Sequence, residues 1–246
     1  MMRGPGEIIR CPSCGMCQSR MTLRSGNTFG ATFYSDGKRV APMLPEFPHF
    51  VKCPKCSVFF KIDESVRYFP KNAGEFLIDA DDFELPSFIR QLGDLRLKDL
   101  LPRGIPGVRF LTIDEYRQAI SEGLYNGEKN DMQLLRISLW RAYNDRSRVE
   151  DNIYTNELFD VPDEERVYQE NCRHIVSDFT KNDDDKDRLL CAELFRNLGE
   201  FNACTHMLSE VQDKKKYKNY ISSIIAACEA KKYAHYLHKS NGYKCF

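Results

Sequence analysis

The spacing of hydrophobic residues changes near residue 112. Before this point apolar residues come in short runs, separated by cysteine pairs, glycine and proline. Short runs rich in β-branched and aromatic residues are typical of strands. After residue 112 apolar residues recur at intervals of three and four, which is the repeat of one helix face. The pattern therefore predicts an α+β chain, with a small β region first and an all-α region after it.

Several segments of the first region are expected to be extended. They are residues 8–10, 28–34, 38–41, 50–52 and 58–62. Ser35-Asp36-Gly37 separates the second segment from the third, and Asp-Gly at such a position is a strong hairpin signal. We therefore expect residues 28–41 to form a β-hairpin.

Six helices are predicted after residue 112. They cover about residues 112–120, 131–146, a segment that begins at Pro162, 186–198, 200–211 and 214–230. Thr112 and Glu115 have the spacing of a capping box, and Pro162 suits the first turn of a helix. The last helix has the most regular apolar stripe, formed by Tyr217, Tyr220, Ile221, Ile224, Ile225 and Cys228.

Proline and glycine recur between the two regions and interrupt any long element there. They are Pro70, Pro86, Pro102, Pro106, Gly74, Gly93, Gly104 and Gly107. The acidic run at residues 79–84 has no histidine or spaced acidic partner, so a solvated loop is favoured over a metal site. These features divide the chain into residues 1–66, an irregular connector at 67–111 and a helical domain at 112–246.

The first region contains two Cys-Pro-x-Cys motifs, Cys11 with Cys14 and Cys53 with Cys56. Each turn directs two sulfur atoms toward one point, and two such turns supply the four thiolates of a tetrahedral zinc site. Closing the segment between them costs about 3 kcal/mol of loop entropy, whereas structural zinc contributes about 10–16 kcal/mol in small zinc peptides. We predict a structural Zn site with these four ligands, and iron bound in a rubredoxin-like shell is the alternative.

These motifs and their flanking segments resemble a zinc ribbon, a family in which each cysteine turn lies at the tip of a β-hairpin. The resemblance covers about residues 7–62. The long insert between the motifs departs from the usual pattern, and so does Ser57, where many ribbons carry glycine. Because four ligands already complete a tetrahedral shell, we expect Cys17 to be a spectator, with His49 the other residue that could replace a ligand.

A second resemblance lies in the helical region, at residues 190–204. It is similar to a tetratricopeptide repeat, in which two helices meet at a Gly-x-aromatic turn and small residues allow close packing. The matching residues are Ala192, Phe195, Gly199, Phe201 and Cys204. The resemblance implies a surface for a protein partner, and an ordinary helical bundle whose helix ends at Gly199 is the alternative.

Charge is balanced overall, with 36 basic and 36 acidic residues, but it is unevenly distributed. Residues 1–70 carry ten Lys and Arg against five Asp and Glu, or +5, so the remaining 26 and 31 give −5. A basic ribbon permits a nucleic-acid interface, although simple solvation of a small domain is the favoured interpretation. The candidates are Arg10, Arg20, Arg24, Lys38, Arg39, Lys52, Lys55 and Lys61, with Phe29, Phe33 and Tyr34 for stacking.

The composition indicates a soluble protein. Mean hydropathy is −0.52, residues 1–6 lack the apolar segment of a signal peptide, and no run approaches the ~20 apolar residues of a membrane span. We therefore expect a cytoplasmic protein with reduced thiols and no membrane contact. Four further cysteines fall in helical apolar patterns and are expected to be core residues: Cys172, Cys191, Cys204 and Cys228.

Other constellations do not form recognisable catalytic sites. Asp183, Asp185 and Asp187 lack the glycine and the glutamate of a calcium loop, so helix capping explains them better. A basic C-terminus explains His235, His238 and Cys245 better than a metal site does, and Cys172 and His174 do not share a helix face. We therefore expect a non-enzymatic adaptor that binds a protein partner through its helical domain. The alternative is a nucleic-acid-binding protein that uses the basic ribbon.

Overall fold

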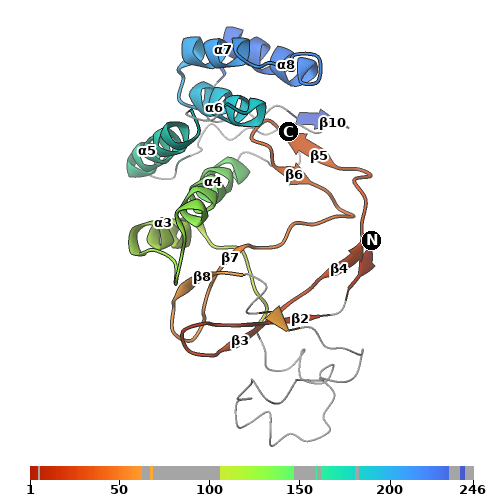
Figure 1. The fold of residues 1–246 in the computed structure, drawn as a ribbon, viewed down its shortest axis with the longest axis vertical. Helices are drawn as coiled ribbons and strands as arrows, with labels where there is room; N and C mark the ends of the chain where they lie inside the picture. The colour runs from red at the N-terminus through yellow and green to blue at the C-terminus, as the bar shows by residue number, and fades with distance from the viewer. Residues whose placement is uncertain are drawn as a thin grey trace, which may run out of the picture. The chain divides into compact units, whose positions relative to one another are not determined.

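The computed structural model describes the chain in two compact units. It describes residues 1–4, 6–62, 67–68, 106–146, 159, 162–180, 183–232 and 239–241. The ribbon unit consists of Met1–Asn27, Met43–Leu111 and Gly123–Gly127, and the helical unit of Thr28–Pro42, Thr112–Glu122 and Glu128–Phe246. Short antiparallel strand pairs come first and helices follow (Figure 1), which confirms the predicted α+β fold class. The acidic run at 79–84 and most of the expected connector lie outside the described residues.

Small antiparallel ladders form the ribbon unit. Its strands are β1 (Met2–Arg3), β2 (Glu7–Arg10), β3 (Cys17–Arg20), β4 (Leu23–Ser25), β7 (Phe50–Lys52), β8 (Phe59–Lys61) and β9 (Arg67–Tyr68). β2 pairs with β3 and with β9, β1 pairs with β4, and β7 pairs with β8. The apolar core lies between the β2–β3 and β7–β8 hairpins, where Ile9, Val51 and Phe60 are each no more than 1% exposed. Phe50, Val51, Phe59 and Phe60 are each no more than 2% exposed, so side chains on both faces of the β7–β8 hairpin are buried. Each of the two hairpins carries one cysteine turn.

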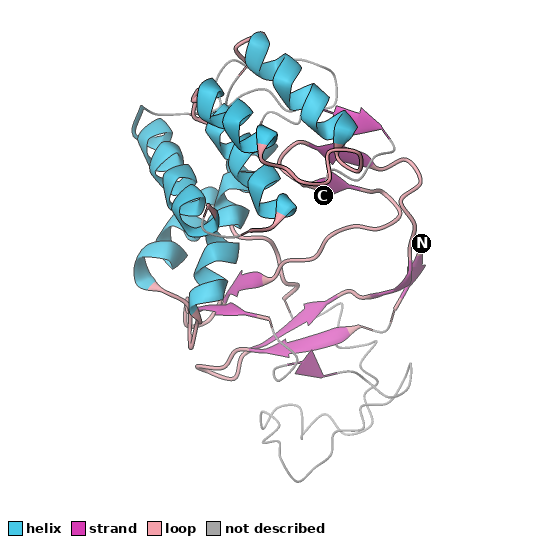
Figure 2. Cartoon of the chain, turned by 45° about the horizontal axis from the view of Figure 1, so that its top comes forward, coloured by secondary structure: helices cyan, strands magenta, loops and turns pink. Residues whose placement is uncertain are grey.

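Six helices are described in the helical unit, close to the predicted ranges. They are α3 (Ile113–Glu122), α4 (Lys129–Asp145), α5 (Pro162–Phe179), α6 (Asp185–Asn197), α7 (Phe201–Ser209) and α8 (Lys218–Glu229). Each helix contacts the next along the chain, and α8 also contacts α6. Figure 2 shows these helices grouped together, each beside the next along the chain. Of the described helices, none combines the length and apolar character needed to cross a membrane.

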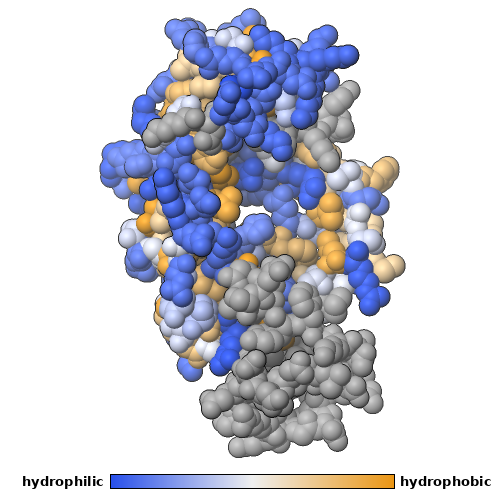
Figure 3. Space-filling model, viewed as in Figure 1, coloured by the Kyte–Doolittle hydropathy of each residue, from blue (hydrophilic) through white to orange (hydrophobic). Residues whose placement is uncertain are grey.

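Local signals fix several helix ends. The Thr112 hydroxyl accepts a hydrogen bond from the Glu115 amide at 3.2 Å, and the Glu115 carboxylate accepts one from the Thr112 amide at 3.0 Å. This is the predicted capping box. Helix α8 begins later than predicted, because residues 214–217 form turns that present exposed lysines. The face of α7 and α8 seen in Figure 3 is accordingly mostly hydrophilic.

The hairpin at 28–42 forms as predicted but groups with the helices. β5 (Thr32–Tyr34) pairs with β6 (Arg39–Val40) and, on its other edge, with β10 (Lys239–Asn241). Gly37 has a φ of +75°, which only glycine adopts readily, and its amide bonds to the Tyr34 oxygen at 3.0 Å. The expected division placed this segment in a ribbon at 1–66. The structure assigns it to the helical unit because its tip is buried there.

Three helices hold the tip of this hairpin. Ser35 Oγ donates to Glu193 Oε1 of α6 at 2.6 Å, and Asn144 Nδ2 of α4 donates to the Asp36 carboxylate at 3.1 Å. Tyr220 of α8 donates its hydroxyl proton to the Ser35 backbone oxygen at 2.8 Å. These bonds join residues 158, 108 and 185 positions apart in the chain. Turn chemistry predicts the hairpin, but it carries no information about such distant partners.

The predicted turn between α6 and α7 is also present. Gly199 has a φ of +75° and follows the last turn of α6, where its amide bonds to the Arg196 oxygen at 3.0 Å. Ala192 and Cys204, assigned to the small sites of the helix pair, are both 0% exposed. Cys204 Sγ lies 3.4 Å from Cys228 Sγ of α8, so small side chains do permit close packing here. Membership of this pair in a repeat family stays a prediction.

Candidate metal centre

Both cysteine turns have the same backbone geometry. In each turn the first cysteine donates its amide to the residue five positions later and accepts from the residue four positions later. The bonds are Cys11 to Met16 at 2.8 Å and Gly15 to Cys11 at 3.0 Å in the first turn, and Cys53 to Val58 and Ser57 to Cys53, both at 2.9 Å, in the second. Gly15 has a φ of +72° and Ser57 a φ of +61°. The departure from the family pattern at Ser57 therefore falls at a left-handed position, where glycine is normally favoured.

These turns bring four sulfur atoms together. The Sγ atoms of Cys11, Cys14, Cys53 and Cys56 all lie within 4.8 Å of one another. Cys11 Sγ is 3.7 Å from Cys56 Sγ, and Cys14 Sγ is 3.6 Å from Cys53 Sγ, so both short contacts connect the two turns. Four sulfurs at ~2.3 Å from one zinc ion occupy tetrahedron corners about 3.8 Å apart. The spacing and the all-thiol donor set therefore fit a tetrahedral metal ion.

Two of the four cysteines lie in the apolar core. Cys11 and Cys53 are each 1% exposed and belong to the core of the ribbon unit, whereas Cys14 and Cys56 are half-buried. Met16 and Val108 pack against the same core. The first cysteine of each turn is thus fixed by packing, and the second lies nearer the surface.

Burial raises the pKa of these thiols, and backbone amide donors lower it. Burial raises the pKa of Cys11 to about 12 and also raises the pKa of Cys14. The Val58 amide, which donates to the sulfur of Cys56, lowers the pKa of Cys56 to about 7. Amide donors stabilise a thiolate, and a bound divalent cation would favour the thiolate at every ligand. The protein therefore supplies part of the stabilisation that four deprotonated sulfurs require.

The two alternative ligands lie outside the cluster. Cys17 begins β3, where its thiol contacts the Gly15 oxygen at 3.8 Å, and His49 is exposed just before β7. Within the described residues, the four cysteines of the two motifs form the sole group of three or more His, Cys, Asp or Glu side chains placed to share an ion. His235, His238 and Cys245 lie outside the described residues.

The acidic run before α6 has the predicted capping role. The Asp184 carboxylate accepts the Lys186 amide at 2.9 Å, and Asp183 and Asp185 both pair with Arg188. Asp185 also accepts the amides of residues 212 and 213, each at 2.8 Å. These contacts account for the run without a cation.

The four cysteines expected in the helical core are buried, as predicted. Cys172, Cys191 and Cys204 are 0% exposed, and Cys228 is 6% exposed. Burial raises the pKa of Cys191 to about 12, which keeps this thiol protonated and unreactive. His174 is exposed whereas Cys172 is buried, so these two residues do not form a dyad.

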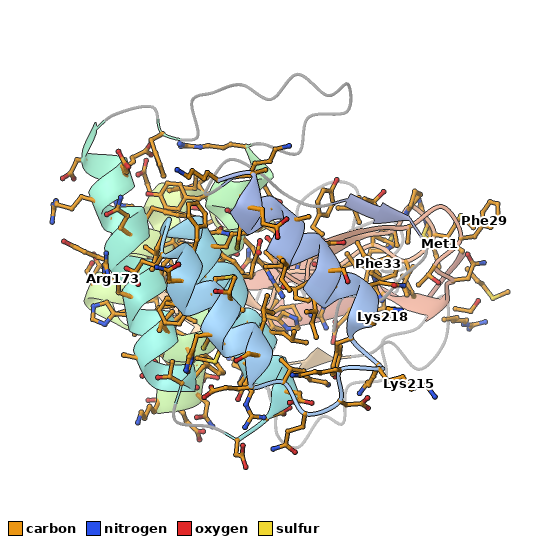
Figure 4. The ribbon with its side chains drawn as sticks, turned by 90° about the horizontal axis from the view of Figure 1, so that it is seen from above. Met1, Phe29, Phe33, Arg173, Lys215 and Lys218 are labelled. Atoms are coloured by element: carbon orange, nitrogen blue, oxygen red, sulfur yellow. The ribbon has the colours of Figure 1, made fainter. Side chains whose placement is uncertain are left out.

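The residues considered for nucleic-acid contact are divided between the two units. Lys38 and Arg39 belong to the helical unit, as do Phe29, Phe33 and Tyr34. Phe33 is 8% exposed and packs inside, whereas Phe29 is 85% exposed and projects from the hairpin (Figure 4). In the ribbon unit, Arg20 Nε already pairs with the buried Glu7 carboxylate at 2.5 Å. The described ribbon unit therefore lacks the stacking aromatics that the hypothesis assigned to it.

Sequence reasoning missed a buried polar network in the helical unit. Arg196 and Glu193 of α6 form a bidentate ion pair, with N–O distances of 2.6 and 2.8 Å, and both side chains are 0% exposed. Asn197 Oδ1 accepts from Trp140 at 3.1 Å and from Tyr168 at 2.7 Å. The sequence did contain a sign of this network, because Glu193 and Arg196 are an oppositely charged pair at i, i+3 within a largely apolar stretch of helix.

Comparison with protein-family models, with curated protein sequences and with solved structures gives no significant match to this chain.

Proposed function

We propose that this protein is a non-enzymatic zinc-binding adaptor that engages a protein partner through its helical unit. One observation carries the proposal: two separate hairpins place four thiols at the spacing of a tetrahedral metal shell. A shell of four protein ligands leaves no open position for a substrate or a catalytic water. The ion therefore has a structural role, which is to hold the two hairpins together.

Zinc is the metal we assign to the site. A tetrahedral shell of four sulfurs suits zinc, and iron is the other common occupant of such a shell. Zinc has no redox chemistry, so it serves a purely structural site in a reducing compartment without side reactions. Iron would give a coloured protein, which distinguishes the two metals directly.

Chain connectivity relates the metal to the helical unit. The chain leaves the ribbon unit after Asn27, forms the hairpin that is buried among the helices, and re-enters the ribbon unit at Met43. The first cysteine turn precedes this excursion and the second follows it. A metal that joins the two turns therefore constrains both ends of the inserted segment. This arrangement supports a scaffold, in which a small metal-bound element fixes the two ends of the hairpin segment that belongs to the binding element.

Helix packing supports the adaptor part of the proposal. Consecutive packed helices present surfaces and grooves that suit extended or helical peptides. The test is affinity purification of the full-length protein from its own cells after nuclease treatment, together with elemental analysis. We expect about one zinc per chain and a protein partner that remains bound at high salt. Iron in place of zinc would overturn the metal assignment. A parallel purification without nuclease that recovers nucleic acid with a steep salt dependence, while the nuclease-treated one recovers no protein partner, would overturn the adaptor.

A further inference from the structure

A groove of about 570 Å³ lies on the helical unit between α3, α4 and α5. Helix α4 contacts both of the other helices. The polar residues used in the argument below come from all three helices, and the half-buried Ile120 and Val167 are their apolar neighbours. These polar residues are Arg117, Arg136, Asn171 and Glu170.

Arg136 is the unusual residue of this groove. Its side chain is half-buried, and burial lowers the pKa of its guanidinium. Among the described residues no carboxylate lies within ion-pair distance of Arg136, and Asp178 acts on it only at longer range. Within the described part of the chain, its side chain donates one hydrogen bond, to Asn171 Oδ1 at 3.4 Å, which is near the limit for such a bond. A desolvated guanidinium without a counter-ion is unfavourable, so an anion placed here would be stabilised.

The carboxylates of the groove do not supply that anion. Asp114 and Glu170 have side chains that are 87% and 57% exposed, and each faces an arginine other than Arg136. Asp114 lies 3.5 Å from Arg117, and Glu170 lies 2.9 Å from Arg166. Arg117 makes only long contacts, the second of them to Asp163 at 3.7 Å. Arg117 can therefore turn toward a new anion at small cost, because exposed ion pairs contribute little.

Asn171 fixes the geometry beside Arg136. Its side-chain amide nitrogen donates to the Arg136 backbone oxygen at 3.0 Å, and the residue as a whole is 3% exposed. This bond directs the amide oxygen toward the guanidinium and leaves the remaining N–H donors of Arg136 available. Two guanidinium groups beside an apolar strip match a peptide in which an acidic side chain stands next to an aliphatic one.

We propose that this groove binds an acidic peptide segment of a partner protein, with a carboxylate between Arg136 and Arg117 and an aliphatic neighbour on Ile120 and Val167. The inference rests on the proposed adaptor function and names the chemical class of its partner. Charge complementarity favours an acidic occupant, and the apolar strip favours a peptide over a free anion.

The test begins with selection of random dodecapeptides, displayed on phage, against the full-length zinc-loaded protein. We expect enriched peptides to share an acidic position beside an aliphatic one. Changing that acid to its amide should weaken binding by roughly tenfold to a hundredfold, as expected for the loss of a charge-assisted hydrogen bond. Arg136→Gln should cause a similar loss, and the two changes together should cost less than their sum.

Matched variants separate a binding role from a structural one. Arg173→Gln also removes an arginine of the helical unit, on α5 (Figure 4), but Arg173 pairs with Glu200 outside the groove, so affinity should not change. Arg136→Lys keeps the charge and should retain part of the affinity. The peptide's own acid-to-amide change leaves the protein untouched and remains informative even if Arg136→Gln unfolds.

Two outcomes would overturn the inference. One is the absence of an acidic position in the enriched peptides, and the other is equal binding of the acidic peptide by Arg136→Gln and the unaltered protein. If a native partner is recovered equally by both proteins, the groove assignment fails while the adaptor function stands. If the unaltered protein recovers no protein partner, the adaptor function itself fails.

Discussion

Ser57 ends its cysteine turn in a strained left-handed conformation, whereas Gly15 adopts the same conformation without strain. Both residues have a left-handed backbone, but only Ser57 carries a Cβ there. This conformation costs an L-residue roughly 1–2 kcal/mol, partly offset because glycine loses more backbone entropy on folding. The two turns share one hydrogen-bond pattern, so Ser57 adopts the backbone conformation that glycine has in the first turn.

Replacing this serine by glycine should therefore stabilise the protein. We expect Ser57→Gly to raise the free energy of unfolding by about 0.5–1 kcal/mol, measured by urea titration in a zinc buffer. Ser57→Ala is the matched control, because it removes the hydroxyl but keeps the Cβ, and it should give no gain. A lower stability for Ser57→Gly would show that the serine hydroxyl has a role that the strain argument omits.

Cys17 provides a second test at this scale. Its thiol contacts the Gly15 oxygen and lies outside the four-sulfur cluster, so Cys17→Ser should leave zinc content and the melting temperature unchanged. Cys14→Ser removes one ligand of four and should lower the zinc content measured by elemental analysis. Equal losses of zinc from the two variants would place Cys17 in the shell.

At the scale of elements, α6 organises the helical unit. Its Glu193 accepts from the hairpin residue Ser35 and pairs with Arg196, whose guanidinium also donates to the Lys232 backbone oxygen at 2.7 Å. Burial lowers the pKa of Arg196, but the Glu193 carboxylate more than offsets this and holds the net pKa above its ordinary value. One carboxylate therefore neutralises a buried cation and also holds the hairpin.

Loss of this carboxylate charge should destabilise the helical unit strongly. We expect Glu193→Gln to lower the free energy of unfolding by about 3–5 kcal/mol, because it removes the carboxylate charge that pairs with the buried Arg196. Chemical denaturation followed by far-UV circular dichroism measures this loss. Arg173→Gln breaks an exposed pair and should leave the midpoint almost unchanged. Similar midpoints for both variants would mean that the buried pair contributes little.

At the scale of the whole molecule, the two units have separate cores. The ribbon unit depends on a small apolar cluster and the four cysteines, whereas the helical unit buries a larger set of side chains that includes Trp140, Tyr143, Leu189 and Leu194. A small domain buries too little surface to be stable alone, and zinc commonly supplies the missing stability. Metal loss should therefore affect the two units unequally.

Chelation of the full-length protein tests this expectation. In hydrogen-exchange measurements, the backbone amides of the ribbon strands, including β2, β3, β7 and β8, should lose protection, while those of α4 and α6 remain protected. The hairpin at 28–42 should keep partial protection, because its contacts to the helices remain although its ends are released. The same measurement after zinc is restored controls for irreversible damage. Simultaneous loss of protection in strands and helices would show that the two units unfold together.

The sequence by itself determined the elements whose signals are local. Paired Cys-Pro-x-Cys motifs predict two turns with one sulfur cluster, and Asp36-Gly37 predicts a hairpin. Apolar spacing and caps such as Thr112 with Glu115 give the helices to within a few residues. These features depend on residue spacing over a few positions, or on paired cysteine motifs whose common role is metal binding. They can therefore be predicted from the sequence alone.

Only the tertiary structure decided which elements pack together. The hairpin between the cysteine motifs belongs with the helices because Ser35 and Asp36 find partners more than 100 residues away. The same long-range packing buries Glu193 and Arg196, which the helix pattern alone would place on a surface, and leaves Arg136 half-buried without a carboxylate partner among the described residues. Glu193 and Arg196 pair with each other within α6, but Ser35 and the Lys232 backbone oxygen complete their hydrogen bonds, and these further partners are set by the fold.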